Sequence, residues 1–229
     1  MGREKRILVS ETVGAYHVMS RIVGGQMLLH DREKNYFLQL LERLALGFFV
    51  KIHAFAILDN HFHILLSVNT DEAYFATKEE LWSRYKLMYG ADSEPPAGQK
   101  VKGVFIPDKD DGELRLKLRL GSVSCFMQTL KQSFSSWYNK KNKRKGYLWG
   151  DRFKSIIVYI GDCHLICGAY IDLNPVRAGI VTLPETYKWS SVGLRAMVPE
   201  RAEKLLHPLL VTKNEAKVIP GLLAKPAPN

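Results

Sequence analysis

The stretch from Phe48 to Val68 constrains the fold of this chain more than any other. Its sequence, FFVKIHAFAILDNHFHILLSV, is rich in apolar, β-branched and aromatic residues, and Asp59-Asn60 stands near its middle. The β-branched and aromatic residues favour strands, whereas the Asp-Asn pair favours a tight turn. We therefore predict two antiparallel strands joined at this turn.

The elements on either side follow from the spacing of apolar residues. They are strands over 16–23 and 153–160, and helices over 31–47, from 123 into the basic run 140–145, and over 163–173. The order β-α-β-β-α-β-α predicts an α+β fold of the ferredoxin-like or RRM-like split βαβ type. In that fold a central antiparallel sheet carries helices on one face, and we expect function on the other, open face.

The segment over about 71–121 is interpreted as a helical and loop insertion. Lys78–Met88 has helical spacing, 91–110 contains Pro95-Pro96 and resembles a loop, and LRLKLRL at 114–120 alternates like a strand. We predict a single catalytic domain over residues 1–191, on which Trp189-Ser190-Ser191 packs back. Residues 192–229 are expected to form a C-terminal extension and loose tail.

Composition indicates a globular protein of a reducing compartment. Hydrophobic residues make up 46% of the chain and charged residues 24%, which excludes disorder for the bulk of it. No stretch approaches the roughly 20 apolar residues of a membrane span, and MGREKRILVSETVGAYH lacks a signal-peptide hydrophobic region. Three cysteines are poor material for a disulfide framework. We expect a cytoplasmic protein without a membrane partner.

The net charge of +10 favours a polyanionic partner such as nucleic acid. Much of it lies between residues 123 and 154, where a single acidic residue accompanies the basic ones. We predict that these bind nucleic acid: Lys131, Lys140, Lys141, Lys143, Arg144, Lys145, Arg152 and Lys154. Trp137, Tyr138, Tyr147 and Trp149 lie in the same stretch and could stack on bases of a single strand. Trp137 and Tyr138 also share the apolar face of the helix, where core packing is the simpler interpretation.

Two histidines on the second strand of the hairpin are candidate metal ligands. Side chains alternate along a strand, so Phe62 and Ile64 face the core while His61 and His63 face the other side. Two imidazoles one pleat repeat apart can bind one ion together. Two ordinary sheet histidines would show the same spacing, so the pair alone does not establish a metal site.

The predicted third helix adds Tyr170 and Asn174. Four helical residues turn through about 400°, so both side chains face the same way. A phenol is a usable nucleophile when a cation polarises its target, and an amide oxygen can bind a hard divalent ion. The alternative is a tyrosine packed on the surface and an asparagine that stops the helix. Cys163 and Cys167 share this stripe, but thiolates would favour zinc, and small core residues are the simpler interpretation.

Four motifs, in their order along the chain, resemble those of single-tyrosine HUH transposases and especially the REP-associated tyrosine transposases. They are LDNHFHILLSV, GYLWGDRFKS, YIDLNPVRAGIV and YKWSS, and together with YHVMSR and FLQLLERLA they span about residues 16–191. The resemblance implies that His61, His63 and Asn174 hold a divalent ion, Mg²⁺ or Mn²⁺. It also implies that Tyr170 attacks a phosphate of single-stranded DNA beside a short hairpin, becomes joined to the 5′ end and leaves a free 3′-OH.

The expected function is therefore a transposase-like enzyme that nicks and rejoins single-stranded or hairpin DNA through a covalent 5′-phosphotyrosine. One alternative is a catalytically decayed or domesticated domain that binds structured DNA or RNA without cutting it. Another is a metal-dependent phosphodiesterase in which water attacks. Similar transposases include dimers and monomers, so a homodimer is left open.

Overall fold

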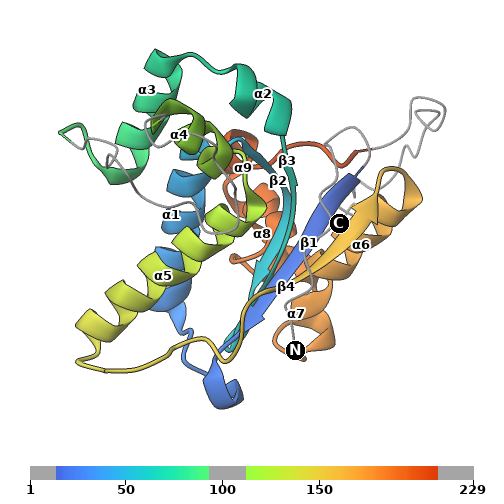
Figure 1. Ribbon diagram of the computed structural model, residues 1–229. Helices are drawn as coiled ribbons and strands as arrows, with labels where there is room; N and C mark the ends of the chain where they lie inside the picture. The colour runs from blue at the N-terminus through green and yellow to red at the C-terminus, as the bar shows by residue number, and fades with distance from the viewer. Residues whose placement is uncertain (1–13, 93–111, 211–229) are drawn as a thin grey trace, which may run out of the picture.

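The computed structural model describes residues 14–92 and 112–210, and a four-stranded antiparallel sheet lies at its centre (Figure 1). The strands are β1 (Gly14–Arg21), β2 (Val50–Ile57), β3 (His61–Val68) and β4 (Lys154–Tyr159), in the spatial order β2-β3-β1-β4. β2 and β3 form the predicted hairpin, while β1 pairs with both β3 and β4. The predicted α+β fold is confirmed.

The first face of the sheet carries the main core. Helices α1 (Asp31–Gly47) and α5 (Val123–Lys141) pack on it, and Phe62, Ile64 and Leu66 of β3 point toward them. Aromatic rings fill much of the interface: the ring of Phe37 lies 4.7 Å from that of Phe62 and 5.3 Å from that of Phe134, between centroids. The alternation of β3 and the helical spacing of α1 and α5 thus supply one continuous apolar layer.

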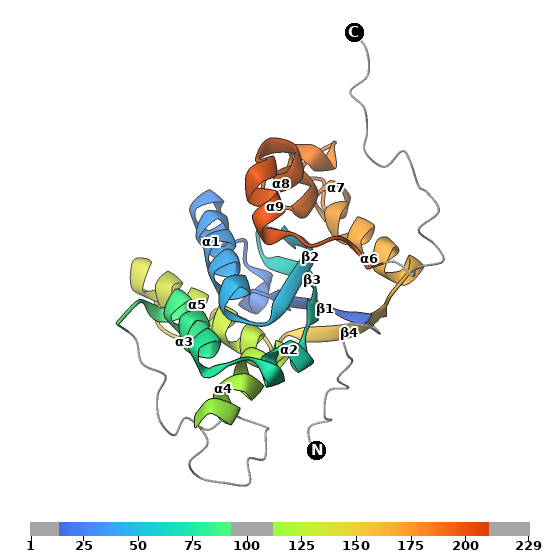
Figure 2. The ribbon, with the colours of Figure 1, turned by 90° about the horizontal axis from the view of Figure 1, so that it is seen from above.

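The second face is covered in part, whereas the sequence led us to expect it open. Helix α6 (Asp162–Asp172) lies across it, opposite α1 and α5 (Figure 2), and α7 (Asn174–Arg177) continues from its end. The apolar layer under α6 is small, with Ala15, Ala54, Ala56, Leu58, Leu65, Val158 and Ile171 as its buried members. Several of these side chains are alanines, and their small size lets a helix approach the sheet closely.

The insertion is helical where it is described. It contains α2 (Thr70–Phe75), α3 (Lys78–Tyr89), which contacts α1, and α4 (Gly112–Leu120). The strand expected over residues 114–120 is wrong, because this segment lies in α4. Leu116 and Leu120 are buried one helical turn apart, and Glu113 pairs with Lys117 at 2.8 Å across one turn. Leu, Lys and Arg favour helices, and no β-branched residue opposes them. Most of the predicted 91–110 loop lies outside the described residues.

The chain after α7 packs back on the same domain. Trp189, Ser190 and Ser191 are buried as expected, and Ser190 forms an antiparallel bridge with Ala56 of β2. Helices α8 (Ser191–Met197) and α9 (Pro199–Leu205) follow, and Leu194 and Leu205 join the main core. Residues on both sides of position 191 therefore share one core. The remaining elements of the described segments are two 3-10 turns, Val23–Gly25 and Pro184–Thr186. Across residues 14–92 and 112–210, no helix is long and apolar enough to span a bilayer.

Candidate active site

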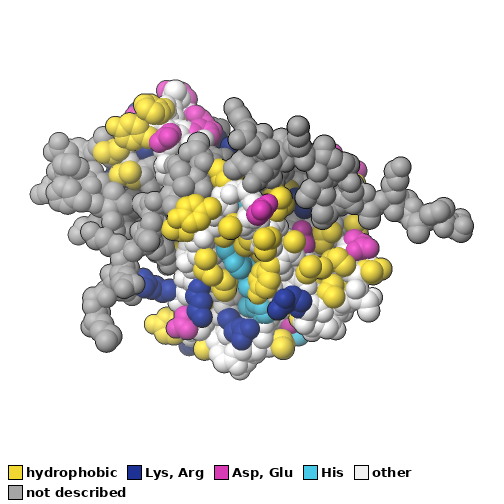
Figure 3. Space-filling model, turned by 90° about the vertical axis from the view of Figure 1, so that its right-hand side faces the viewer, with side chains coloured by type: hydrophobic (Ala, Val, Ile, Leu, Met, Phe, Trp, Pro, Cys, Tyr) yellow, Lys and Arg dark blue, Asp and Glu magenta, His cyan; other side chains and the backbone are white. Residues whose placement is uncertain are grey.

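A cleft on the second face brings the four candidate catalytic residues together. It has a volume of about 730 Å³ and is lined by His61 and His63 from β3, by Tyr170 from α6 and by Asn174 from α7. Figure 3 shows histidine side chains at the surface of this face, with lysine and arginine side chains around one end of them. The placement of α6 over the sheet thus joins two motifs that lie far apart in the sequence.

The orientation of the His61 ring is fixed by Asn60. The Nδ1 atom of His61 lies 2.6 Å from Oδ1 of Asn60, and the Asn60 amide nitrogen donates to the carbonyl of Gly25 at 2.9 Å. Because the amide group is committed to Gly25, its oxygen faces His61, so Nδ1 of His61 carries the hydrogen and donates. Nε2 of His61 is left with its lone pair, which is the arrangement of a histidine ligand.

His17 of β1 orients His63 in a similar way. Its Nε2 atom lies 2.9 Å from Nδ1 of His63. If Nε2 of His63 binds an ion, Nδ1 of His63 carries the hydrogen and donates to His17. The sequence analysis missed His17, since a single histidine in a strand has no motif of its own. The alternation of YHVMSR does place it on one face with Met19 and Arg21, but only the pairing of Met19 with His63 brings it to the site.

Burial keeps these imidazoles neutral near pH 7. It lowers the pKa of His63 to about 3, with smaller contributions from His17, His61 and Arg21, and it lowers the pKa of His17 to about 4. The pKa of His61 is also lowered, mainly by burial and then by Arg21, against an opposing contribution from Asp59. The neutral imidazole is the form that binds metal ions.

Asn174 reaches the cleft although it does not continue α6 as a regular helix. α6 ends at Asp172 and Pro175 follows, but Leu173 keeps helical angles (φ −84°, ψ −5°), so α7 continues from it. Asn174 is 8% exposed, and in the described parts of the chain its side-chain amide has no hydrogen-bond partner. An amide at the wall of a cleft that has no protein partner is suited to a ligand.

Tyr170 is the exposed member of the site. Its side chain is 39% exposed, and its ring lies 6.0 Å from that of His63 and 6.1 Å from that of His17, between centroids. The guanidinium carbon of Arg177 lies 5.3 Å from the centre of the Tyr170 ring. No residue of the described segments hydrogen-bonds to the Tyr170 hydroxyl, which leaves the oxygen accessible to a substrate.

The cleft also has four cations in its wall, next to a single acidic residue, Asp151. Arg152 and Lys154 belong to the predicted basic patch, whereas the sequence analysis missed Arg21 and Arg177. Arg177 could have been found, because it continues the stripe of Tyr170 and Asn174 by one more helical turn. Within residues 14–92 and 112–210 these side chains form no ion pair with a carboxylate, so their charge is available to phosphates.

The rest of the predicted patch does not line the cleft. Lys140, Lys141, Lys143 and Lys145 are exposed at the end of α5 and in the loop after it, and Arg144 is half-buried there. Lys131 donates to the carbonyl of Asp151 at 2.6 Å and lies 5.6 Å from the centre of the Trp149 ring. The predicted patch is therefore divided into a group in the cleft, a group at the end of α5, and Lys131, which lies between them.

Of the four aromatic residues considered for base stacking, Tyr147 is the exposed one, at 89%. Trp149 and Tyr138 are buried in the main core, and Trp137 stacks on Tyr36 with centroids 4.0 Å apart. The interpretation of Trp149 as a base-stacking residue is wrong, because the rings of Phe62 and Phe134 surround it at 5.4 and 5.7 Å.

The donor set fits a hard divalent ion better than zinc. Within the described residues, no three His, Cys, Asp or Glu side chains come together in a way that could hold a metal. Cys167 does not line the cleft, and burial raises the pKa of its thiol to about 11. Two imidazole nitrogens and one amide oxygen with open positions are a set that Mn²⁺ or Mg²⁺ accepts. His61, His63 and Asn174 thus fit the ion that the resemblance implies.

Comparison with known proteins adds a structural likeness. No family model matches the chain, and no curated protein matches it. A solved structure of a REP-associated tyrosine transposase bound to a REP hairpin is similar over 90% of this chain and 89% of that chain, with a TM-score of 0.53 and 14% sequence identity. At this identity the likeness shows a shared fold.

Proposed function

We propose that this protein is a DNA-binding, transposase-like enzyme that cuts and rejoins single-stranded DNA through Tyr170. The observation that carries the proposal is the cleft itself, in which an accessible tyrosine hydroxyl faces two oriented histidines among four cations. The fold shared with a transposase bound to a REP hairpin supports DNA as the partner. One chain supplies all four candidate residues, and a homodimer stays a prediction.

In the proposed reaction, separate groups of residues bind the metal ion, orient its ligands and bind the DNA phosphates. His61, His63 and Asn174 would hold Mg²⁺ or Mn²⁺, which when bound stabilises negative charge on the phosphate. Asn60 and His17 orient the two imidazoles, whose Nε2 atoms would then bind the ion. Arg21, Arg152, Lys154 and Arg177 would follow the phosphates of the strand and hold the scissile one beside Tyr170.

The chemical step is an in-line displacement at phosphorus. The Tyr170 oxygen loses its proton to solvent and forms a bond to the phosphorus atom, while the bond to the 3′ oxygen of the preceding nucleotide breaks. That oxygen takes up a proton and becomes a free 3′-OH. The 5′-phosphotyrosine keeps the energy of the broken bond, so a 3′-OH can attack it and rejoin the strand without ATP.

A covalent-adduct assay tests the proposal. A pool of hairpin oligonucleotides with random flanking single strands is incubated with the protein and Mn²⁺, and protein-linked DNA is separated on a denaturing gel. We expect an adduct that Tyr170→Phe abolishes and that the matched control Tyr159→Phe, at an exposed tyrosine of β4, leaves unchanged. Equal adduct from Tyr170→Phe would overturn the assignment.

The two alternatives give different results in the same assay. A domain that binds without cutting would retain the hairpins but form no adduct with wild-type protein. A phosphodiesterase that uses water would release cleaved DNA that is not linked to protein, and Tyr170→Phe would remain active.

A further inference from the structure

Helix α6 buries little apolar surface against the sheet. Its buried residues are His164, Gly168 and Ile171, whereas Ile166 is 68% exposed and Leu173, which follows the helix directly, is 45% exposed. A helix with so little buried apolar surface gains correspondingly little from the hydrophobic effect. Other contacts must therefore set the position of Tyr170 over the cleft.

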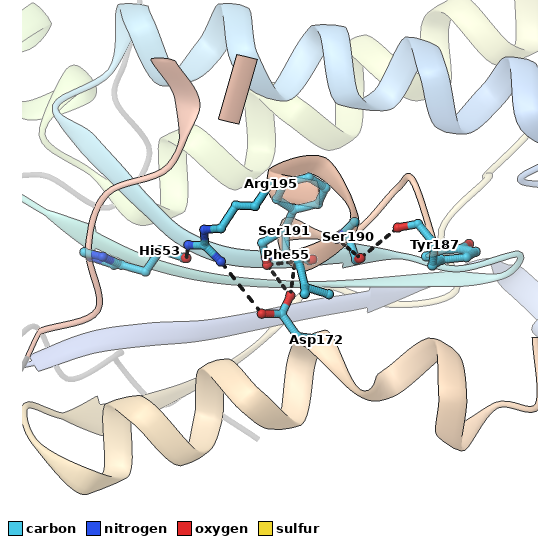
Figure 4. A network of polar contacts seen from close by, with 9 residues as sticks. His53, Phe55, Asp172, Tyr187, Ser190, Ser191 and Arg195 are labelled. Atoms are coloured by element: carbon cyan, nitrogen blue, oxygen red, sulfur yellow. Dashed lines mark hydrogen bonds and ion pairs between the residues drawn. The ribbon is translucent and has the colours of Figure 1, made fainter. Parts of the chain in front are cut away.

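Asp172 provides such contacts on the side of α6 that faces away from the cleft. It lies two residues from both Tyr170 and Asn174, a turn of about 200° on a helix. Its Oδ1 atom accepts hydrogen bonds from Ser191 Oγ at 2.5 Å and from the Val192 amide at 3.0 Å (Figure 4). Its Oδ2 atom lies 3.9 Å from the guanidinium of Arg195. The carboxylate thus binds the first turn of α8, where backbone amides have no hydrogen-bond partner within the helix.

Helix α8 is in turn fixed to the sheet. Ser191 Oγ accepts a hydrogen bond from the backbone amide of Phe55 in β2 at 3.0 Å, and Arg195 donates to the carbonyl of His53 at 3.4 Å. Ser190 Oγ accepts from the Gly193 amide at 3.1 Å and caps the helix. A continuous series of polar contacts therefore runs from β2 through α8 to the C-terminal end of α6.

We propose that Asp172 is a positioning residue: through Ser191, Val192 and Arg195 it holds the C-terminal end of α6 on the sheet, and so holds Tyr170 over His61 and His63. The consequence for catalysis rests on the proposed function. The anchoring of α6 does not, and it can be measured without DNA.

The reactivity of Cys167 measures the anchoring directly. Cys167 lies on α6, partly buried against the second face, while Cys125 is buried on the opposite side of the sheet. In a Cys163→Ser background, which removes the exposed thiol of α6, iodoacetamide labelling is followed by mass spectrometry. We expect Asp172→Ala to accelerate labelling of Cys167 by at least about tenfold, because local opening of α6 exposes it.

Three further variants sharpen the measurement. Asp162→Ala, at the exposed first turn of the same helix, is expected to leave Cys167 as protected as in the parent protein. Ser191→Ala is expected to accelerate its labelling, by less than Asp172→Ala does. Asp172→Asn keeps an oxygen that can accept from Ser191 and Val192 but loses the charge facing Arg195, so we expect it to restore most of the protection.

The second readout is the adduct assay at saturating hairpin DNA. Asp172→Ala is expected to lower the single-turnover rate of adduct formation at saturating Mn²⁺ by at least about tenfold, while hairpin affinity changes less than about threefold, since misplacement of a nucleophile costs rate rather than binding. Rescue of the rate by Asp172→Asn would support positioning over a general loss of structure.

The outcomes separate the two proposals. Unchanged labelling of Cys167 in Asp172→Ala overturns the anchoring role, and so does an equal rise at Cys125, because Asp172 would then stabilise the whole fold. Faster labelling of Cys167 alone supports it. If wild-type protein forms no adduct while that labelling result holds, the anchor stands and the proposed function falls.

Discussion

The two faces of the sheet are built from the same four strands, but they differ in the size of their side chains and in how firmly helices pack on them. The first face presents Phe62, Ile64 and Leu66 to α1 and α5 in a deep aromatic and aliphatic layer. The second presents alanines and histidines to α6, which makes few apolar contacts with the sheet. Polar contacts also hold α6, from Asp172 to α8 and from His164 to the amide of Leu210. Large side chains stabilise the first face, whereas small ones on the second leave room for a helix and for the cleft beside it.

The largest expected effect comes from a matched pair of leucines on β3. Leu66 and Leu65 are both fully buried but face the first and the second side of the sheet. We expect Leu66→Ala to lower the free energy of unfolding by about 3–5 kcal/mol and Leu65→Ala by about 2–3 kcal/mol, because α6 can settle into the smaller layer while the aromatic core cannot collapse. Urea unfolding measures both, and equal losses would contradict this difference between the faces.

The second-largest expected effect is a loss of folding stability at acid pH, caused by a buried histidine on the second face. His164 on α6 is buried, and burial, with a smaller contribution from His53, lowers its pKa to about 4. As pH falls from 7 to 5, the unfolded chain binds a proton that the folded chain does not, so stability is lost in that window. The linked loss is on the order of 2 kcal/mol. His164→Gln should reduce the pH dependence of Tm, to which His17 and His63 also contribute, whereas His30→Gln, at an exposed position, should leave it unchanged.

A smaller effect is expected for His17 and His63 on this face, and the affected quantity is the affinity for the metal ion. His17→Phe removes the partner of His63 Nδ1, and we expect Mn²⁺ affinity to fall by about 10–100-fold without a change of fold. Isothermal titration and circular dichroism measure the two quantities. An unchanged affinity would mean that His63 does not bind the ion through Nε2.

Single cations should have the smallest effects. Arg152 lines the cleft, while Lys141 is exposed at the end of α5. We expect alanine at either position to reduce the slope of log affinity against log salt by about 0.7, the amount for one contact with a single-stranded phosphate. Arg152→Ala alone should also slow adduct formation at saturating DNA. A rate loss for Lys141→Ala would place the α5 group at the reacting phosphate as well.

The sequence was sufficient to predict the elements that depend on residues close together in the chain. The turn at Asp59-Asn60 and the alternation around His61 predicted the hairpin and its two faces, and the helical spacing of α1 and α5 predicted the main core. The strand expected over 114–120 failed because strict alternation of Leu with Lys and Arg also suits a helix when those residues favour helices and pair across one turn.

The missed parts depend on contacts between distant segments. His17 and Arg21 reach the cleft only because β1 pairs with β3 in one particular register. Asp172 and Ser191 are joined only because α8 folds back on β2. The expectation of an open second face overlooked the alanines of β2, whose small side chains leave space for α6.

The central claim is that His61, His63, Asn174 and Tyr170 form one metal-dependent site. The most direct test is a crystal of the protein soaked in Mn²⁺, with the ion located by its anomalous scattering. We predict one strong peak in the cleft, contacted by Nε2 of His61, Nε2 of His63 and Oδ1 of Asn174 and facing the Tyr170 hydroxyl. A peak bound elsewhere, or no peak in the cleft at saturating Mn²⁺, would contradict the claim.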